Sequence, residues 1–390
     1  MSRYNFDEIL DRRGSASMKW DASPAADVRP MWVADMDFRS APAIASAVAE
    51  IAARGVYGYG IAPDSYFDAV IAWFSRRHGL NLRREWIIPV TGVLPGLAAT
   101  LRALCAEGDK VIVQTPVYSC FFPTITENGC VPLQLPLLRG ADGRYEMDFE
   151  ALGQAASDPR AKLLLLCSPH NPTGRVWSRE ELERVEAICR RHSTIVVADE
   201  IHCDLVAPGL SHLPYAALGS DFPANCVMLS SPTKGFNIAG LQIANIFVSD
   251  PGLRSRIALQ VEAHRCGHVN IMGQAALEAA YRDSEDWLDA LNAYLHDNFL
   301  FLKDFLAHEL PSLSVSPLEG TYLVWLDCRS LGRSSVLLEK ELLEKARVRL
   351  NAGRPYGEGG EGFLRINIAC PRALLEEGLN RIANLLKQKA

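Results

Sequence analysis

Lys234 is the side chain of this 390-residue chain whose position most clearly predicts chemistry. It lies in the run 230–240, directly after the apolar residues 227–229, which predict a buried strand. The lysine therefore stands in a loop at a strand's carboxyl end, where open α/β sheets bind ligands. An ammonium shielded from water has a lowered pKa, and its free amine can form a Schiff base. A solvated loop lysine is the plainer alternative, so the rest of the chain must decide.

Three further segments with ligand-binding character also follow apolar runs. Residues 92–96, residues 171–174 and Asp199 each stand at the end of a predicted strand. Glycines next to a helix start, as in residues 92–96, offer backbone amides to a phosphate. Each feature also has a purely structural interpretation: residues 92–96 as a tight turn, residues 171–174 as an Asn-Pro turn and Asp199 as a helix cap. Arg365, much later in the chain, is a further candidate for the site, and its structural alternative is a surface ion pair. Their succession at strand ends favours one shared ligand site.

The elements that would position these residues are βαβ units. Residues 85–250 alternate short apolar runs with helical patterns, which predicts a mostly parallel sheet. The clearest unit starts with residues 162–167, an apolar run without alternation, as in a strand covered on both faces. Ser178 and Glu181 form a capping-box pattern at the start of the next helix, and residues 194–198 form the second strand.

Other segments complete this picture of an α/β protein. Residues 92–96 are expected to lead into a helix over 97–106. Beyond residue 251 the sequence is rich in helical patterns, the longest through residues 287–299. The strand-like residues 322–326 and 364–368 predict a smaller α+β module near the end of the chain.

Bulk composition excludes several classes of function. The chain is 48% hydrophobic and 22% charged with a formal net charge of −6, and its basic residues are dispersed, so neither nucleic-acid nor membrane partners are indicated. Residues 1–21 lack the apolar core of a signal peptide, and no apolar run is long enough to span a bilayer. We therefore expect a cytoplasmic protein.

Cysteine and histidine spacing indicates neither disulfides nor a metal. Ten cysteines are scattered without a CxxC pair, which predicts reduced core thiols. Nine histidines show no HExxH pattern, and the closest local cluster, residues 202–204, lacks partners at ligand spacing. We predict that no metal is bound.

Longer motifs carry a resemblance to a known family. The residues Asn171-Pro172-Thr173-Gly174, Asp199-Glu200, Ser231-Pro232-Thr233-Lys234 and Arg365-Ile366-Asn367 resemble the fold-type I pyridoxal phosphate (PLP) enzymes of the class I/II aminotransferase superfamily. The resemblance covers essentially the whole chain. Residues 31–38, 92–96, 168–174, 199–204 and 233–237 narrow it to the MalY/PatB type of cystathionine β-lyase.

This resemblance implies an α/β fold of PLP fold-type I. The large domain would hold a mostly parallel, mixed seven-stranded sheet flanked by helices, and a smaller α+β domain would follow. The implied boundaries are 1–45 for an N-terminal arm and part of the small domain, 46–285 for the PLP-binding domain and 286–390 for the small domain.

The resemblance also implies that the cofactor is PLP, held by Lys234 as a Schiff base. Asp199 would pair with the pyridine nitrogen and keep it protonated, because a carboxylate favours the cationic form. Asn171 would hydrogen-bond the phenolic oxygen, and Tyr118 would stack on the ring. His202 stands where relatives often carry a tyrosine, so its contact with that oxygen is a weaker implication.

The phosphate would be held by residues from two loops. By resemblance, these are Gly92, Val93, Leu94, Ser231 and Thr233. Many aminotransferases carry an arginine eight residues after the lysine, but this chain has Gln242 there. More of the charge compensation must then come from the helix start.

The substrate and the partner subunit are implied in the same way. Arg365 would bind the substrate carboxylate as a bidentate fork, with Asn171 beside it. Tyr57 resembles the tyrosine that relatives contribute to cofactor and substrate across a dimer interface, so a homodimer with shared active sites is expected. Residues 31–38 and 353–362 could line or cover the side-chain pocket, or simply pack.

The implied reaction is carbon–sulfur β-elimination from L-cystathionine or a related cysteine S-conjugate, in sulfur amino-acid metabolism. Lys234 would remove the Cα proton, and a thiol, pyruvate and ammonia would be released. An aminotransferase is the nearest alternative, distinguished by its need for a keto acid. A PLP-binding regulatory protein with little turnover is a further alternative, which the complete polar set opposes.

Overall fold

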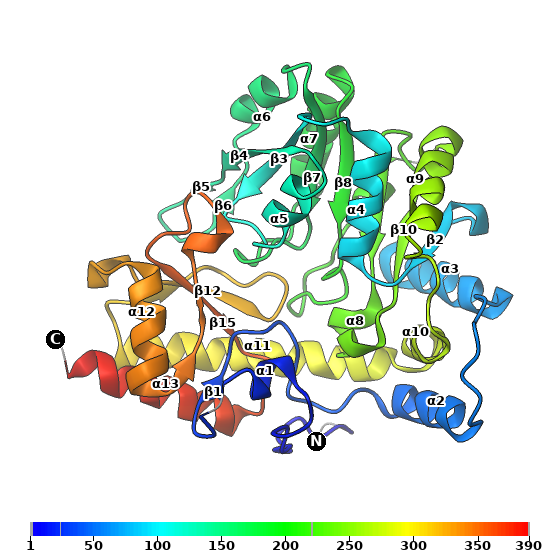
Figure 1. Ribbon diagram of the computed structural model, residues 1–390. Helices are drawn as coiled ribbons and strands as arrows, with labels where there is room; N and C mark the ends of the chain where they lie inside the picture. The colour runs from blue at the N-terminus through cyan, green and yellow to red at the C-terminus, as the bar shows by residue number, and fades with distance from the viewer. Residues whose placement is uncertain (1–2, 24, 220, 389–390) are drawn as a thin grey trace.

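A mixed seven-stranded sheet forms the centre of the protein in this computed structural model, which describes residues 3–23, 25–219 and 221–388 (Figure 1). In spatial order its strands are β2 (Ile87–Val90), β10 (Ala244–Phe247), β9 (Cys226–Ser230), β8 (Ile195–Asp199), β7 (Ala161–Cys167), β3 (Lys110–Thr115) and β4 (Val131–Pro136). Only β10 runs against its neighbours, and all other neighbouring pairs are parallel. The carboxyl ends of β2, β7, β8 and β9 therefore meet at one edge of the sheet.

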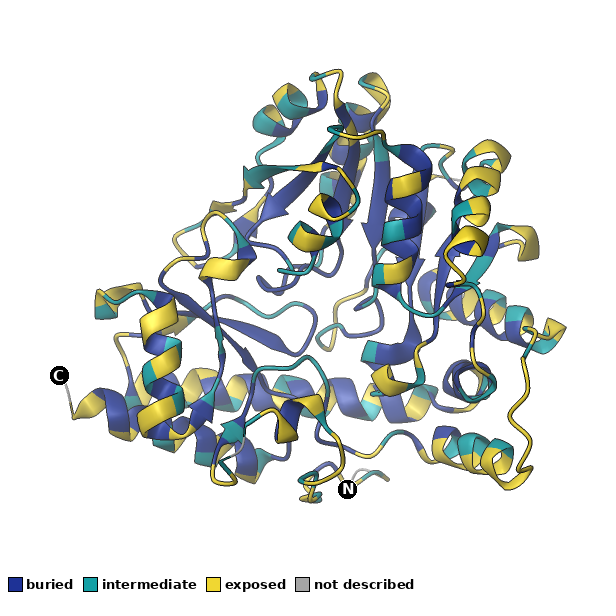
Figure 2. Cartoon of the chain, viewed as in Figure 1, coloured by how far each residue is buried: buried dark blue, intermediate teal, exposed yellow. Residues whose placement is uncertain are grey.

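Helices cover both faces of this sheet, which explains the strand sequences. In β7, Leu163 and Leu165 pack with one group of helices, whereas Leu164 and Leu166 pack with the other. All four side chains are buried, as the non-alternating apolar run predicted (Figure 2). The first face carries α4 (Val93–Leu104), α5 (Phe121–Thr126) and α9 (Pro251–Ala263). The second carries α3 (Asp64–His78), α6 (Phe149–Ala156), α7 (Arg179–Arg191) and α10 (Ile271–Asp283), with α2 (Pro42–Ala53) packed on α10.

A smaller antiparallel sheet lies in the C-terminal part of the chain. Its strands are, in order, β11 (Ser314–Val315), β12 (Leu323–Asp327), β15 (Phe363–Asn367) and β14 (Asn351–Ala352), with helices α11 (Glu285–Glu309), α12 (Ser335–Glu341) and α13 (Arg372–Lys387). Near the N-terminus, α1 (Met18–Asp21) precedes β1 (Arg29–Pro30), which pairs in parallel with β13 (Val348–Arg349). A further hairpin joins β5 (Leu138–Arg139) to β6 (Tyr145–Glu146).

The pairing of β1 with β13 thus joins the N-terminal residues to the C-terminal part of the chain, where residues 1–45 were expected to contribute to the small domain. Those boundaries, 1–45, 46–285 and 286–390, remain a proposal. The α/β class and the mixed seven-stranded sheet of the prediction are confirmed. Within the described residues, no helix has the length and apolarity needed to cross a bilayer.

Local signals near the site were mostly confirmed, with one correction. The Ser178 hydroxyl oxygen accepts a hydrogen bond from the Glu181 amide, and the Glu181 carboxylate accepts one from the Ser178 amide, as the capping box predicted. The helix expected over 97–106 instead begins at Val93 and ends at Leu104. Pro95 does not prevent this, because a proline in the first helical turn removes an amide that has no helical partner.

Candidate active site

A cavity of about 240 Å³ lies at the edge where the strand ends meet. Its lining is formed by Ala34, Gly92, Val93, Leu94, Pro95, Tyr118, Cys167, Asn171, Asp199, Ile201, His202, Thr233, Lys234 and Ala239. Nine of the residues predicted for the site are in this set. The remaining three, Ser231, Arg365 and Tyr57, are described below.

Lys234 reaches the cavity from α8 (Pro232–Gly235), a single helical turn directly after β9. Its Nζ donates a hydrogen bond of 2.6 Å to the carbonyl oxygen of Ala34. Burial, with the positive charge of Arg365 nearby, lowers the pKa of Lys234 to about 8. At pH 7 about a tenth of the molecules therefore carry Lys234 as a neutral amine, the form that a nucleophile or base requires and that a solvated lysine rarely adopts at this pH.

Asp199 ends β8 and is almost fully buried. Its Oδ1 accepts a hydrogen bond of 3.1 Å from the Ile201 amide, and no described cation donates one to it. Burial raises the pKa of Asp199 to about 7. A buried carboxyl group of this kind would gain most from a cationic partner placed in the cavity.

The raised pKa of Asp199 gives a testable effect on stability. Between about pH 4 and pH 7 the unfolded chain releases a proton that folded Asp199 retains, so the free energy of unfolding falls as the pH rises. Asp199→Asn removes the titrating group and with it this decrease in the free energy of unfolding. Without a ligand, the variant should gain stability over the wild type across that window, by up to about 4 kcal/mol, and hold the gain at higher pH.

Urea unfolding from pH 4 to pH 8 measures this difference. The surface variant Glu107→Gln is the control, because that side chain is exposed, and it should show no such slope. A difference between Asp199→Asn and wild type that does not change with pH would contradict the assignment.

Arg365 comes from the smaller sheet, on β15, and is 4% exposed. Its Nη1 donates to Asn171 Oδ1 at 3.3 Å, and its Nη2 donates to the Trp32 carbonyl at 2.7 Å. Its guanidinium carbon lies 5.3 Å from the Tyr356 ring centre, while its buried Nε has no hydrogen-bond partner. A buried guanidinium with an unused donor is suited to an incoming carboxylate.

The first turn of α4 also borders the cavity. Gly92 precedes the helix, and the amides of Val93 and Leu94 belong to the first turn, where no helical carbonyl accepts them. Such amides, with the positive end of the helix dipole, bind anions. Gly96 has a packing role instead, since an added Cβ would lie 3.3 Å from both Val90 and Ile246.

Two hydroxyl residues after β9 were predicted to support the same anion. Thr233 lines the cavity. The Ser231 hydroxyl donates to the Ile243 carbonyl at 2.5 Å and lies 2.7 Å from the Thr233 hydroxyl oxygen, so it acts on the cavity through Thr233. Its direct role in anion binding remains a prediction.

The phenol of Tyr118 and the imidazole of His202 line the cavity as uncharged groups. Burial raises the pKa of Tyr118, so its phenol stays protonated. Burial and the charge of Lys234 hold the pKa of His202 well below its ordinary value, and its Nδ1 has no partner. Both groups are therefore neutral. Tyr57 is 60% exposed, donates to the Ala52 carbonyl and lies outside the cavity of its own chain.

Sequence reasoning left open whether residues 31–38 lie at the site, and it missed Tyr322. The Ala34 carbonyl accepts hydrogen bonds from both Lys234 and Tyr322, so the early segment is part of the site. A backbone carbonyl carries no sequence signal. Tyr322 belonged to a recognisable strand, but nothing local showed which way its hydroxyl points.

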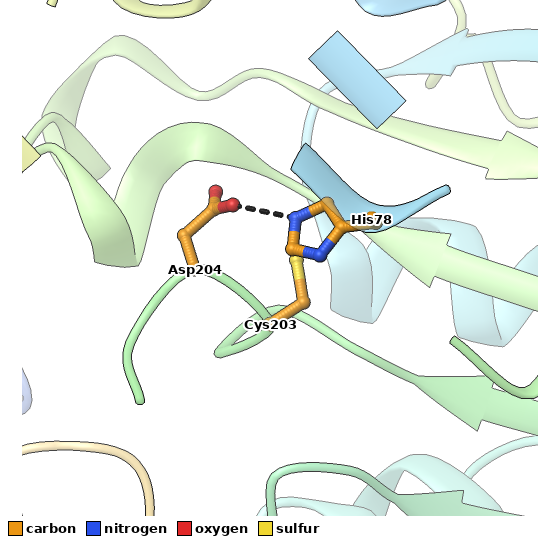
Figure 3. Close-up of side chains that lie close together, drawn as sticks. All are labelled: His78, Cys203 and Asp204. Atoms are coloured by element: carbon orange, nitrogen blue, oxygen red, sulfur yellow. Dashed lines mark hydrogen bonds and ion pairs between the residues drawn. The ribbon is translucent and has the colours of Figure 1, made fainter. Parts of the chain in front are cut away.

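A second cluster of buried polar side chains lies outside the cavity lining (Figure 3). The structure brings His78 to Cys203 and Asp204, the partner that local spacing did not reveal, and their ligand atoms lie within 4.8 Å of one another. Asp204 Oδ1 accepts from His78 Nε2 at 2.8 Å and from Trp73 Nε1 at 3.1 Å. The carboxylate is thus already paired. The expectation of no bound metal remains a prediction.

The chain belongs to the aminotransferase class I and II family, whose model matches residues 33–382. It is 41% identical over 382 residues to cystathionine beta-lyase PatB of Bacillus subtilis (strain 168), covering 97% of this chain and 98% of PatB. This likeness confirms the predicted resemblance to the MalY/PatB type.

Solved structures agree with this family. Cystalysin from Treponema denticola, whose crystal structure contains a pyridoxal 5'-phosphate cofactor, matches with a TM-score of 0.96 and 32% identity over 99% of this chain and 100% of cystalysin. The PLP-bound C–S lyase from Staphylococcus hominis matches with a TM-score of 0.92 and 34% identity, over 99% and 100% of the two chains. The predicted fold type I is therefore confirmed.

Proposed function

We propose that this protein is a PLP-dependent carbon–sulfur β-lyase. The observation that carries the proposal is one cavity shared by a partly buried lysine with a lowered pKa, a buried carboxyl group and the first turn of a helix, in a chain similar to C–S lyases over nearly its whole length. The lysine supplies an amine, the carboxyl group a counter-ion for a cation, and the helix start an anion site.

The residues present fit PLP at each of its polar groups. Lys234 would hold the aldehyde carbon covalently, and Asp199 would hold the protonated pyridine nitrogen. Asn171 would donate to the phenolic oxygen with His202 beside it, while Tyr118 would cover the ring. The phosphate would be held by the first turn of α4 and Thr233, with Ser231 behind it. Bound PLP supplies an electron sink for the electrons of the substrate's Cα–H bond.

Substrate orientation would depend on Arg365 and Asn171. The guanidinium would bind the α-carboxylate as a fork, and the 3.3 Å contact with Asn171 holds that fork next to the cofactor site. Lys234, once displaced by the substrate amine, would take the Cα proton as a general base, which its lowered pKa favours.

The proposed reaction balances without an external oxidant. The Cα proton passes to Lys234 Nζ, and the Cβ–S bond breaks with its electron pair on sulfur. Protonation of that thiolate gives the free thiol. Water then hydrolyses the remaining three-carbon fragment to pyruvate and ammonia.

The finer proposal is that L-cystathionine is a substrate, so that the activity is of the cystathionine β-lyase type. Likeness to PatB over 97% of the chain supports it. Incubation with L-cystathionine and chromatography of the products tests it: β-cleavage gives homocysteine and pyruvate. Formation of cysteine and 2-oxobutyrate instead would show γ-cleavage and overturn the proposal. No turnover of cystathionine, with cleavage of other cysteine S-conjugates, would restrict the protein to those conjugates.

We also propose a homodimer in the cytoplasm, in which Tyr57 reaches the partner's site. The extended segment between α2 and α3 is exposed along most of its length (Figure 2). Its exposed side chains include Val56, Tyr57, Tyr59 and Ile61, which offer an apolar surface suited to a second copy. All ten cysteines are free, which supports a reducing compartment. Neither nucleic-acid nor membrane partners are proposed.

Subunit complementation tests the shared site. Tyr57→Ala and Lys234→Ala should each be nearly inactive as pure dimers. Co-refolding them in equal amounts should restore about a quarter of wild-type activity, because half of the dimers are hybrids with one intact site. Activity that stays at the level of the pure variants would contradict the shared site.

A further inference from the structure

The segment of residues 31–38, here called the N-terminal strap, is tied to the site through its carbonyl groups. Arg365 Nη2 and Asn351 Nδ2 donate to the Trp32 carbonyl at 2.7 and 2.6 Å. Asn367 Nδ2 donates to the carbonyls of Val33 and Asp35, both at 2.6 Å. Asn367 thus fixes the backbone on either side of Ala34.

Ala34 lies between Val33 and Asp35 and lines the cavity, and its carbonyl oxygen contacts two side chains of the site. It accepts Lys234 Nζ at 2.6 Å and the Tyr322 hydroxyl at 2.9 Å. A carbonyl oxygen has two lone pairs, so these two donors use its full capacity. The lysine amine and the tyrosine hydroxyl therefore share one fixed acceptor.

Tyr322 is suited to hold this acceptor in place. Its side chain is fully buried directly before β12, and burial raises the pKa of its phenol, which keeps the donated proton in place. Its ring meets the His202 ring edge to face, with centres 6.0 Å apart. Because that packing restricts the ring, the direction of its hydroxyl is also restricted.

We propose that Tyr322 is a positioning residue for Lys234, acting through the Ala34 carbonyl. The inference rests on the proposed function, in which the amine must leave the cofactor and then take the Cα proton. A free lysine chain has four rotatable bonds, and a base must lie within hydrogen-bond reach of its proton. The carbonyl fixed by Tyr322 and Asn367 gives the displaced amine one defined position.

The first test uses the protein without cofactor. Tyr322→Phe removes only the hydroxyl, and Tyr66→Phe is the matched control, because it removes a buried hydroxyl that donates to Asn245 outside the cavity lining. Added PLP is reduced onto Lys234 with borohydride at a series of pH values, and the modified peptide is measured by mass spectrometry. Freed from Tyr322, the carbonyl becomes a better acceptor for an ammonium. The pH midpoint of attachment should therefore rise in Tyr322→Phe and stay unchanged in Tyr66→Phe.

The second test isolates proton transfer from carbon–sulfur cleavage. With PLP bound, exchange of the Cα proton of L-alanine in deuterated water is followed by proton NMR, since alanine has no leaving group on Cβ. Exchange by Tyr322→Phe should be at least about tenfold slower than by wild type or Tyr66→Phe, within the range for a misplaced catalytic group. If wild type exchanges the proton but cleaves no cysteine S-conjugate, the proposed function fails while this inference survives.

Unchanged attachment midpoint and unchanged exchange in Tyr322→Phe would overturn the inference. Circular dichroism and PLP content show whether the variant is folded. If it is not, Asn367→Ala replaces it, because that change loosens the carbonyls on either side of Ala34 and leaves Tyr322 intact. Slower exchange is again expected, and wild-type exchange in a folded Asn367→Ala would overturn the inference.

Discussion

Replacing Lys234 by alanine is expected to abolish turnover, lowering kcat by more than about 10⁴-fold. Lys234 is the one lysine that lines the described cavity, and both proposed roles, covalent attachment and proton removal, need its amine. The variant should still bind PLP, because Asp199, Asn171 and the first turn of α4 are untouched. Absorbance spectra and mass spectrometry after borohydride reduction would show bound but unattached cofactor.

Two comparisons make the result specific to the amine. Lys162→Ala changes an exposed lysine and should keep wild-type activity. Added methylamine should restore part of the turnover of Lys234→Ala, because a small amine can enter the space of the missing side chain. Wild-type turnover by Lys234→Ala would remove this residue from the mechanism.

The second large effect is expected for Arg365→Ala. This change should lower kcat/KM by about 10²- to 10³-fold, the usual result of losing one partner of a buried, hydrogen-bonded ion pair. PLP affinity should change far less, because the guanidinium meets Asn171 and the Trp32 carbonyl but does not line the cofactor cavity. Steady-state kinetics and PLP titration of the cofactor-free protein separate the two effects.

Arg365→Lys is the matched variant for this assignment. Lysine keeps the charge but cannot form two parallel hydrogen bonds to a carboxylate, so it should recover only part of the loss. Loss of PLP binding together with unchanged amino-acid affinity would show that Arg365 serves the cofactor instead.

The sequence alone was enough to predict the site residues at or just after the carboxyl ends of strands. Asn171, Asp199 and Lys234 each stand at the carboxyl end of a buried apolar run, and parallel strands bring those ends to one edge. Their convergence therefore follows from strand order alone. The helix start at Val93 was placed too late, because Gly92 and Pro95 were interpreted as a loop.

Contacts between distant segments could not be predicted in the same way. The Ala34 carbonyl meets Tyr322 across 288 positions of the chain, and a peptide carbonyl looks the same at every residue. His78 pairs with Asp204 across 126 positions for a similar reason, since a helix end and a loop give no sign of facing each other. These contacts depend on how the elements pack, which local periodicity does not encode.

β-Elimination releases an amino group as ammonia, whereas an aminotransferase passes it to a keto acid. L-Cystathionine labelled with ¹⁵N on the amino group of the half that becomes pyruvate distinguishes the two reactions. The PLP-loaded protein is incubated with this substrate, with and without added 2-oxoglutarate, and the label is followed by NMR. We expect labelled ammonium in equal amount to pyruvate and free thiol, at the same rate in both samples. Label that appears only in glutamate, and only when 2-oxoglutarate is present, would contradict β-elimination and show an aminotransferase.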